Sequence, residues 1–303
     1  MARMLARVAP WLPSAKSETD SRSGRSGGLR ALRQDDTAAL WELAAADPVA
    51  NIFALSHLET VRSAAPTPGG GQFVGLFDDD GALTSACWAG VNVVPIGVPA
   101  DDGAEYGRFL ARSRRRYSSI FGPAEGVLSV WGELRHSAPQ PFDVRPEQPL
   151  LAMGAASPLS PAPGLRTTRP GELDTLLPAC TAMFEEEVGY SPVAAGDRQY
   201  RQRVQTLIAK GHSLSHIDAA GRVVFKAELG TVSSQAVQVQ GVWMNPLYRG
   251  QGRSGAYMSA VVAAAQQIAP LTSLYVNSYN APARATYESV GFDRVGTFAT
   301  VLF

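Results

Sequence analysis

A proline-rich segment near the middle of the chain separates two halves that carry the same order of predicted elements. Residues 154–164 read GAASPLSPAPG and have no apolar periodicity, which is typical of a semi-stiff linker. On both sides, apolar alternation and helical spacing predict the order strand, helix, three strands, helix, strand, helix, strand. We therefore expect a mixed α/β protein made of a tandem repeat of one fold, although the halves share no obvious residue identity.

This division predicts four segments along the chain. Residues 1–28 are expected to be a flexible tail, 29–153 a first domain, 154–163 the linker and 164–303 a second domain. We do not expect a secretory signal in this tail, because Arg7, Pro10 and Pro13 interrupt its apolar residues.

The overall composition excludes several classes of protein. The chain has 27 basic and 27 acidic residues, which argues against a broad nucleic-acid-binding surface. No run of 18 apolar residues occurs, so no membrane-spanning helix is expected. The two cysteines, Cys87 and Cys180, are far apart and form neither a disulfide framework nor a metal motif, which fits a reducing cytoplasm and no bound metal. The scarcity of lysine and the abundance of alanine indicate a GC-rich, bacterial coding style.

The segment 242–255 has the character of an anion-binding turn. It reads VWMNPLYRGQGRSG, so a strand leads into a turn with Gly250, Gly252 and Gly255 and then into a long helix. Glycines let successive N–H groups converge, and a helix N-terminus adds partial positive charge, which suits a pyrophosphate. Arg249 and Arg253 add two cations. A glycine-rich connection without a ligand is the alternative.

The segment 274–292 places a tyrosine two helical turns after a capping asparagine. It reads LYVNSYNAPARATYESVGF, in which a strand ends at Asn277 and a helix starts at Asn280. Tyr287 lies seven residues later, and Gly291 followed by Phe292 ends the helix.

Together the two segments resemble the GCN5-related N-acetyltransferase (GNAT) family. The family pattern Arg/Gln-x-x-Gly-x-Gly/Ala is matched by Arg249 and Gly252, with Ser254 where Gly or Ala is usual. The pattern Asn-x-x-Ala-x-x-x-Tyr-x-x-x-Gly-Phe is matched at every named position, namely by Asn280, Ala283, Tyr287, Gly291 and Phe292. The resemblance covers about residues 165–303 and implies a GNAT fold there, with a degenerate GNAT-like fold in the N-terminal half.

This resemblance implies an acyl-CoA-dependent N-acyltransferase, with acetyl-CoA as co-substrate and a primary amine that attacks the thioester directly in a ternary complex. Tyr287 would protonate the leaving thiolate. The backbone of the central strand would bind the pantetheine arm, the turn would bind the pyrophosphate, and Asn280 would contact the pantetheine or the thioester. These cofactor-binding residues are Val242, Trp243, Met244, Arg249, Gly250, Gln251, Gly252, Arg253, Ser254, Gly255, Asn277 and Asn280.

The base that accepts the proton of the amine stays open. Many family members have an acidic residue on the central strand, whereas this chain has Gln240, which can position a water molecule but cannot act as a base. Glu228 on the preceding strand is a candidate. The run Glu185–Glu187 is either a solvated helix end or an acidic rim for the amine, and His212 and His216 are either surface residues or a titrating base.

Two other functions remain open at this stage: a non-catalytic acyl-CoA sensor and a scaffold that has lost its ligand. The expected partner is an amine, in a small molecule or a protein, with no nucleic-acid or membrane partner; a homodimer is a further option. We expect no coenzyme A in the N-terminal half, because Asp101 and Asp102 would repel a pyrophosphate at the corresponding position.

Overall fold

The structure is a computed structural model that describes residues 28–303 apart from residues 114 and 195. The tail predicted at 1–28 therefore lies outside the described residues except for Gly28. The described chain forms two compact units. Unit 1 holds the residues up to Pro149 together with Gly296–Phe303, and unit 2 holds Leu150–Val295.

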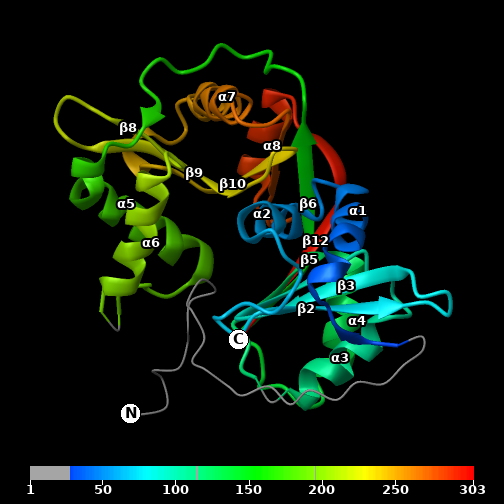
Figure 1. Cartoon of the computed structure of the whole chain (residues 1–303). Coiled ribbons are helices and arrows are strands. Elements are labelled where there is room, and N and C mark those ends of the chain that lie inside the picture. Colours follow the sequence, from blue (N-terminus) through cyan, green and yellow to red (C-terminus); the bar gives the residue numbers. More distant parts are fainter. Residues whose placement is uncertain (1–27, 114, 195) are drawn as a thin grey trace. The chain divides into compact units, whose positions relative to one another are not determined.

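Unit 1 contains a mixed sheet with helices on it (Figure 1). Its strands lie in the order β1-β2-β3-β4-β5-β12, antiparallel except for the pair β4 and β5. The elements are β1 (Arg30–Ala31), α1 (Thr37–Ala45), α2 (Ile52–Val61), β2 (Gln72–Phe77), β3 (Leu83–Ala89), β4 (Asn92–Ile96), α3 (Gly103–Arg112), β5 (Ser119–Pro123), α4 (Ala124–Leu134) and the start of β6 (Asp143–Met153).

Unit 2 repeats this order of elements. Its strands lie in the order β6-β11-β10-β9-β8-β7, antiparallel except for the pair β10 and β11. Helix α7 covers one face of the strands β8 to β10, and α5 and α6 lie on the other face (Figure 1). The elements are β7 (Arg166–Thr167), α5 (Leu173–Val188), α6 (Arg198–Ala209), β8 (Ser213–Ile217), β9 (Val223–Val232), β10 (Ala236–Met244), α7 (Ser254–Ala265), β11 (Leu271–Tyr275), α8 (Ala281–Val290) and the start of β12 (Asp293–Leu302).

The last strand of each half of the sequence ends in the unit that the other half forms. Strand β6 follows α4 in the chain, but its end, Leu150–Met153, pairs antiparallel with β11. Strand β12 follows α8, but Phe298–Leu302 pair antiparallel with β5. Each six-stranded order is thus completed by a strand from the other half of the sequence.

The tandem repeat is confirmed, and contacts at the start of each half reveal a residue correspondence that the sequence analysis missed. The Arg30 guanidinium binds both carboxylate oxygens of Asp36 at 2.7 and 2.8 Å. The Arg166 guanidinium binds both oxygens of Glu172 at 2.8 and 2.6 Å. In both cases the acid also accepts the backbone N–H three residues before it, at 2.7 Å. The same ion pair therefore fixes the entry into the first helix of each unit.

Most expected elements form, and one helix was not expected. Helix α8 begins directly after Asn280 and ends before Gly291, as predicted. Helix α2 was missed, although Asn51 precedes it and Ile52, Leu55 and Leu58 recur on one buried face. A short helix without side-chain capping gives too weak a local signal to stand out in the sequence.

The segment expected to be a linker lies along α7. The Ala162 N–H donates to the Ala256 carbonyl at 2.9 Å, and the Ser259 hydroxyl donates to the Leu159 carbonyl at 2.5 Å. Leu159 also packs against the core of unit 2. The prolines predicted the absence of regular structure here, but these tertiary contacts had no signature in the sequence.

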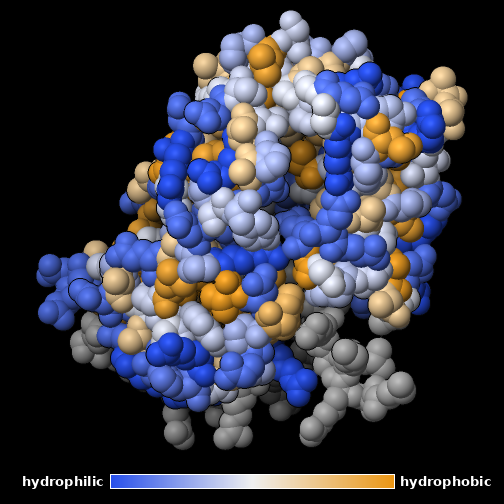
Figure 2. Space-filling model, turned by 180° about the vertical axis from the view of Figure 1, so that it is seen from behind, coloured by the Kyte–Doolittle hydropathy of each residue, from blue (hydrophilic) through white to orange (hydrophobic). Residues whose placement is uncertain are grey.

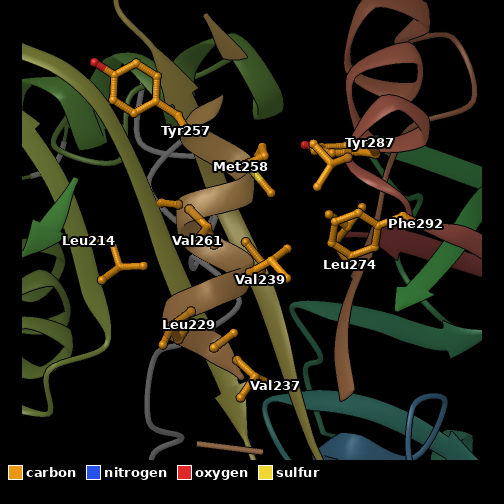
Figure 3. Close-up of a cluster of buried hydrophobic side chains, with 14 of the residues drawn as sticks. Leu214, Leu229, Val237, Val239, Tyr257, Met258, Val261, Leu274, Tyr287 and Phe292 are labelled. Carbon is orange, nitrogen blue, oxygen red and sulfur yellow. The ribbon is translucent and has the colours of Figure 1, made fainter. Parts of the chain in front are cut away.

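The core of unit 2 lies between the sheet and the helices α7 and α8. Figure 3 shows Val239 of β10, Val261 of α7, Leu274 of β11 and Phe292 directed toward one another. On the face of the molecule in Figure 2, hydrophobic residues occur in small groups between hydrophilic ones.

Candidate active site

The two parallel strands of unit 2 stop pairing halfway along β10. Ala236, Val237 and Gln238 pair with Leu271–Ser273 of β11. Beyond that point β11 continues to pair with β6, whereas the registers of the described residues give Val239–Met244 a strand partner only on the β9 side. The backbone N–H and C=O groups of β10 that face β11 are thus available to a ligand.

A β-bulge lies within this unpaired part of β10. The pairing with β9 shifts register between Gln240 and Trp243, and Gly241 has a φ of +58°. A Cβ atom at Gly241 would lie 3.1 Å from the Glu228 Cδ and from the Lys226 Nζ. Glycine is required here by both the backbone conformation and the closeness of these buried groups.

The predicted anion-binding turn precedes α7 and is open. Gly250 and Gly252 both have a φ of +70°, and a Cβ on either would meet nothing within 4 Å. Helix α7 begins at Ser254 without a side-chain cap, so its first N–H groups have no side-chain acceptor. Such a turn has the space and the donors that a pyrophosphate needs.

The side chains around the turn hold it in place. The Gln251 amide donates to the Leu247 carbonyl at 3.0 Å, and the Ser254 hydroxyl lies 3.6 Å from the Met244 sulfur. Val242 packs against the core on the α7 side. A Cβ on Gly255 would meet the Leu159 side chain, so this glycine lets the segment that holds Leu159 pack closely on the start of α7.

The two arginines of the turn have different surroundings. The Arg253 guanidinium lies over the Tyr248 ring, 5.8 Å from its centroid. The Arg249 guanidinium donates to the Met244 carbonyl at 2.8 Å and binds the Glu186 carboxylate of α5 at 2.9 and 3.0 Å. The sequence did not indicate that Glu186 of the acidic run would meet Arg249.

Tyr287 extends from α8 toward α7, with its hydroxyl directed toward Met258 (Figure 3). The residue is 7% exposed, and burial, followed by the nearby Glu187 carboxylate, raises the pKa of its phenol above the usual range. The phenol therefore keeps its proton at neutral pH and can donate it in a hydrogen bond.

The two predicted asparagines border α8. The Asn280 side-chain oxygen caps α8 by accepting the Ala283 N–H at 3.2 Å. The Asn277 amide donates to the Tyr279 hydroxyl at 2.9 Å. Tyr279 and Leu247 are the most exposed of the large hydrophobic residues described, at 74% and 67%.

Glu228 lies in a buried ionic cluster that the sequence did not reveal. Its carboxylate contacts the Lys226 ammonium at 2.6 Å, the Arg203 guanidinium at 2.9 Å and the Gln240 amide at 3.2 Å. Burial by itself would raise the pKa of Glu228, but the Arg203 and Lys226 cations outweigh it and lower this pKa to about 2. A carboxylate with so low a pKa is a weak base.

The corresponding helix start in unit 1 is closed. A Cβ on Gly103, the first residue of α3, would lie 2.0 Å from the Ser129 hydroxyl oxygen of α4. The preceding Asp102 accepts a hydrogen bond from Ser85 at 3.1 Å. The start of α3 thus packs on α4 and carries a carboxylate, whereas the turn before α7 faces open space.

The described residues lack two further features. No group of three or more His, Cys, Asp or Glu side chains there could hold a metal ion. None of the helices formed by those residues combines the length and the apolar character needed to cross a membrane.

Solved structures share this fold over most of the chain. A Drosophila protein is 14% identical with a TM-score of 0.60, and 91% of this chain and 99% of that one are covered. A GCN5-related N-acetyltransferase from Sphaerobacter thermophilus is 17% identical with a TM-score of 0.55, covering 90% and 94%. A tandem GNAT protein from the clavulanic acid biosynthesis pathway is 14% identical with a TM-score of 0.51, covering 90% and 98%.

Two family models match successive parts of the sequence. None of the curated proteins compared with the sequence matches it. The model of a domain of unknown function, DUF4081, matches residues 71–176, and that of the acetyltransferase (GNAT) family matches residues 182–292. The chain therefore has a tandem GNAT-like fold. Its C-terminal half carries a domain of the acetyltransferase (GNAT) family, which follows a domain of unknown function in the sequence.

Proposed function

We propose that unit 2 is an acyl-CoA-dependent N-acyltransferase that transfers acetyl from acetyl-CoA to a primary amine. The observation that carries the proposal is the combination of three features in unit 2: the unpaired edge of β10 beyond Gln238, the open turn at Gly250 and Gly252, and the phenol of Tyr287 directed toward α7. Acetyl-CoA supplies an activated thioester, which an amine can attack in a ternary complex.

The residues of the chain then have separate roles. The N–H groups from Arg249 to Gly255 bind the pyrophosphate, and the backbone of Val242–Met244 binds the pantetheine arm. Asn277 and Asn280 border its thioester end. Tyr287 donates its hydroxyl proton to the sulfur as it leaves, which stabilises the developing negative charge.

The acceptor side is the face of β10 that carries Gln240. Since the Gln240 amide donates to Glu228, its carbonyl oxygen can accept a hydrogen bond from an amine or a water molecule. Glu228 remains a candidate base, but its ion pairs with two cations favour a positioning role for it. A water molecule held at Gln240 is then the proton acceptor.

The alternative is a non-catalytic acyl-CoA sensor. It is favoured by the same ionic cluster, because the carboxylate next to the central strand is already paired. Release of free thiol from acetyl-CoA when amines are added separates the two functions, because a sensor binds the coenzyme without releasing thiol.

Calorimetry with acetyl-CoA is the first test. One site per chain is expected, because the start of α3 in unit 1 is closed and acidic. No binding would contradict the proposal, and two sites per chain would contradict the conclusion that the start of α3 in unit 1 is closed to the coenzyme.

The Gly252→Asp variant tests the turn. A carboxylate at this position should abolish binding by charge repulsion and bulk. The matched control is Gly81→Asp in unit 1, since Gly81 has a φ of +81° and equally open surroundings. Both changes impose a similar backbone strain, so a loss of binding in Gly252→Asp alone locates the coenzyme at the turn. Retained affinity would mean that the turn is not the coenzyme site.

A further inference from the structure

Arg249 of the anion-binding turn already has an anionic partner inside the protein. Its terminal nitrogen lies 3.0 and 2.9 Å from the two carboxylate oxygens of Glu186. Its Nε donates to the Met244 carbonyl at 2.8 Å, on the strand whose backbone would bind the pantetheine arm. One guanidinium thus connects the turn, the end of β10 and the C-terminal end of α5.

Glu186 has a second contact on β10. Its carboxylate accepts the indole N–H of Trp243 at 3.0 Å, and the Arg249 guanidinium lies 5.9 Å from the centroid of the Trp243 ring. We call Glu186, Trp243 and Arg249 the Glu186 latch. All three side chains lie on the α5 side of β10.

The latch can open, because water reaches its ion pair. The Arg249 and Glu186 side chains are 44% and 47% exposed, and an ion pair so exposed adds little stability. A pyrophosphate carries more negative charge than one carboxylate and would also receive the N–H groups of the turn. Among the described residues, only the indole of Trp243 donates to Glu186 besides Arg249.

We propose that Glu186 occupies Arg249 in the coenzyme-free protein and that the pyrophosphate of the coenzyme displaces it. This inference rests on the proposed function, because it requires a pyrophosphate at the turn. Glu186 is then a positioning residue: it holds Arg249 at the turn before binding, and it lowers the affinity for the coenzyme because it competes with the pyrophosphate.

The test compares acetyl-CoA binding to two variants of α5. Glu186→Gln should bind acetyl-CoA about two- to fivefold more tightly, the factor that corresponds to the loss of an exposed competing ion pair. Glu185→Gln is the matched control, since it removes the same unfavourable negative charge from the last turn of α5 without touching Arg249. Its dissociation constant should equal that of the wild type.

A double-mutant cycle identifies Arg249 as the shared partner. In the Arg249→Gln background, Glu186→Gln should no longer change the affinity. Coenzyme binding should also shift the fluorescence of Trp243, which loses its carboxylate partner, and this shift should be absent from Trp243→Phe.

Different results overturn the latch and the proposed function. If the wild type does not bind acetyl-CoA, both fail. If the wild type binds but Glu186→Gln binds equally or more weakly, or has the same effect with and without Arg249, the latch is overturned and the proposed function stands.

Discussion

Replacing Glu228 with Gln should destabilise unit 2 by about 3–5 kcal/mol, because the change removes the counter-charge of the buried Lys226 and the partly buried Arg203. Glu228 is 2% exposed and Lys226 is 0% exposed, while the Arg203 side chain is 19% exposed. The lowered pKa of Glu228 gives a similar magnitude. A fall from 4.5 to about 2 corresponds to about 3 kcal/mol of preference for the ionised form in the folded state.

This magnitude depends on burial, and Glu172 provides the control. The pKa of Glu172 is also lowered to about 2, mainly by its hydrogen bonds from Arg166. The side chains of that pair are 37% and 20% exposed, so solvent screens the interaction. Glu172→Gln should therefore cost less than about 1 kcal/mol.

The assay is urea unfolding of both variants, with hydrogen–deuterium exchange over β9 and β10 as the local readout. Exchange should rise in these strands for Glu228→Gln and stay unchanged for Glu172→Gln. If Glu228→Gln unfolds at the same urea concentration as the wild type, the carboxylate is not the counter-ion of a buried cluster, and the reasoning fails.

The ionic cluster around Glu228 also makes the stability of unit 2 depend on pH. The folded pKa of Glu228, about 2, lies below the ordinary value of 4.5. Its stabilising contribution is therefore fully present above about pH 4.5 and is lost as the pH falls toward 2. Glu228→Gln should flatten the stability profile of unit 2 in this window, and an unchanged acid limb would contradict the assigned pKa.

Three further predictions test the site and the fold. Tyr287→Phe should keep the affinity for acetyl-CoA and lower turnover by about 10- to 10⁴-fold in a thiol-release assay, and unchanged turnover would exclude the phenol. Removal of residues 296–303 should increase hydrogen exchange in β5, which loses the pairing partner Phe298–Leu302, and unchanged exchange there would contradict the strand exchange. Gly103→Ala should destabilise unit 1 by about 1–3 kcal/mol, because the added Cβ would meet Ser129. The control Gly132→Ala, which adds a Cβ in open surroundings, should be neutral or stabilising. Equal unfolding midpoints for the two variants would refute the close packing of α3 on α4.

Local sequence predicted much of the fold because its signals are short-range. The strand β10 and the helix α8 follow from alternation, capping and a terminal glycine, which act within a few residues. The turn at Gly250 and Gly252 was predicted for the same reason, since its positive φ angles are a property of these residues themselves. The assignment of these residues to coenzyme binding stays a prediction.

Contacts between distant residues had no comparable signal. The ionic cluster joins Arg203 of α6 to Glu228 of β9, and the latch joins Glu186 of α5 to Arg249 of the turn. Nothing in the local sequence distinguishes the three carboxylates of Glu185–Glu187 from one another. Only the position of α5 on the sheet decides which of them reaches β10. The exchange of β6 and β12 is of the same kind, since a strand carries no local mark of its pairing partner.

The sequence by itself determined the repeated order of elements in the two halves, the glycine turn before α7 and the position of Tyr287 on its helix, because backbone preferences and helical periodicity act locally. Only the tertiary structure decided which strands complete each sheet, which carboxylate meets Arg249 and that Glu228 is buried between two cations. These outcomes depend on packing across tens to more than a hundred residues of chain, where burial and electrostatics select among side chains that look equivalent in sequence.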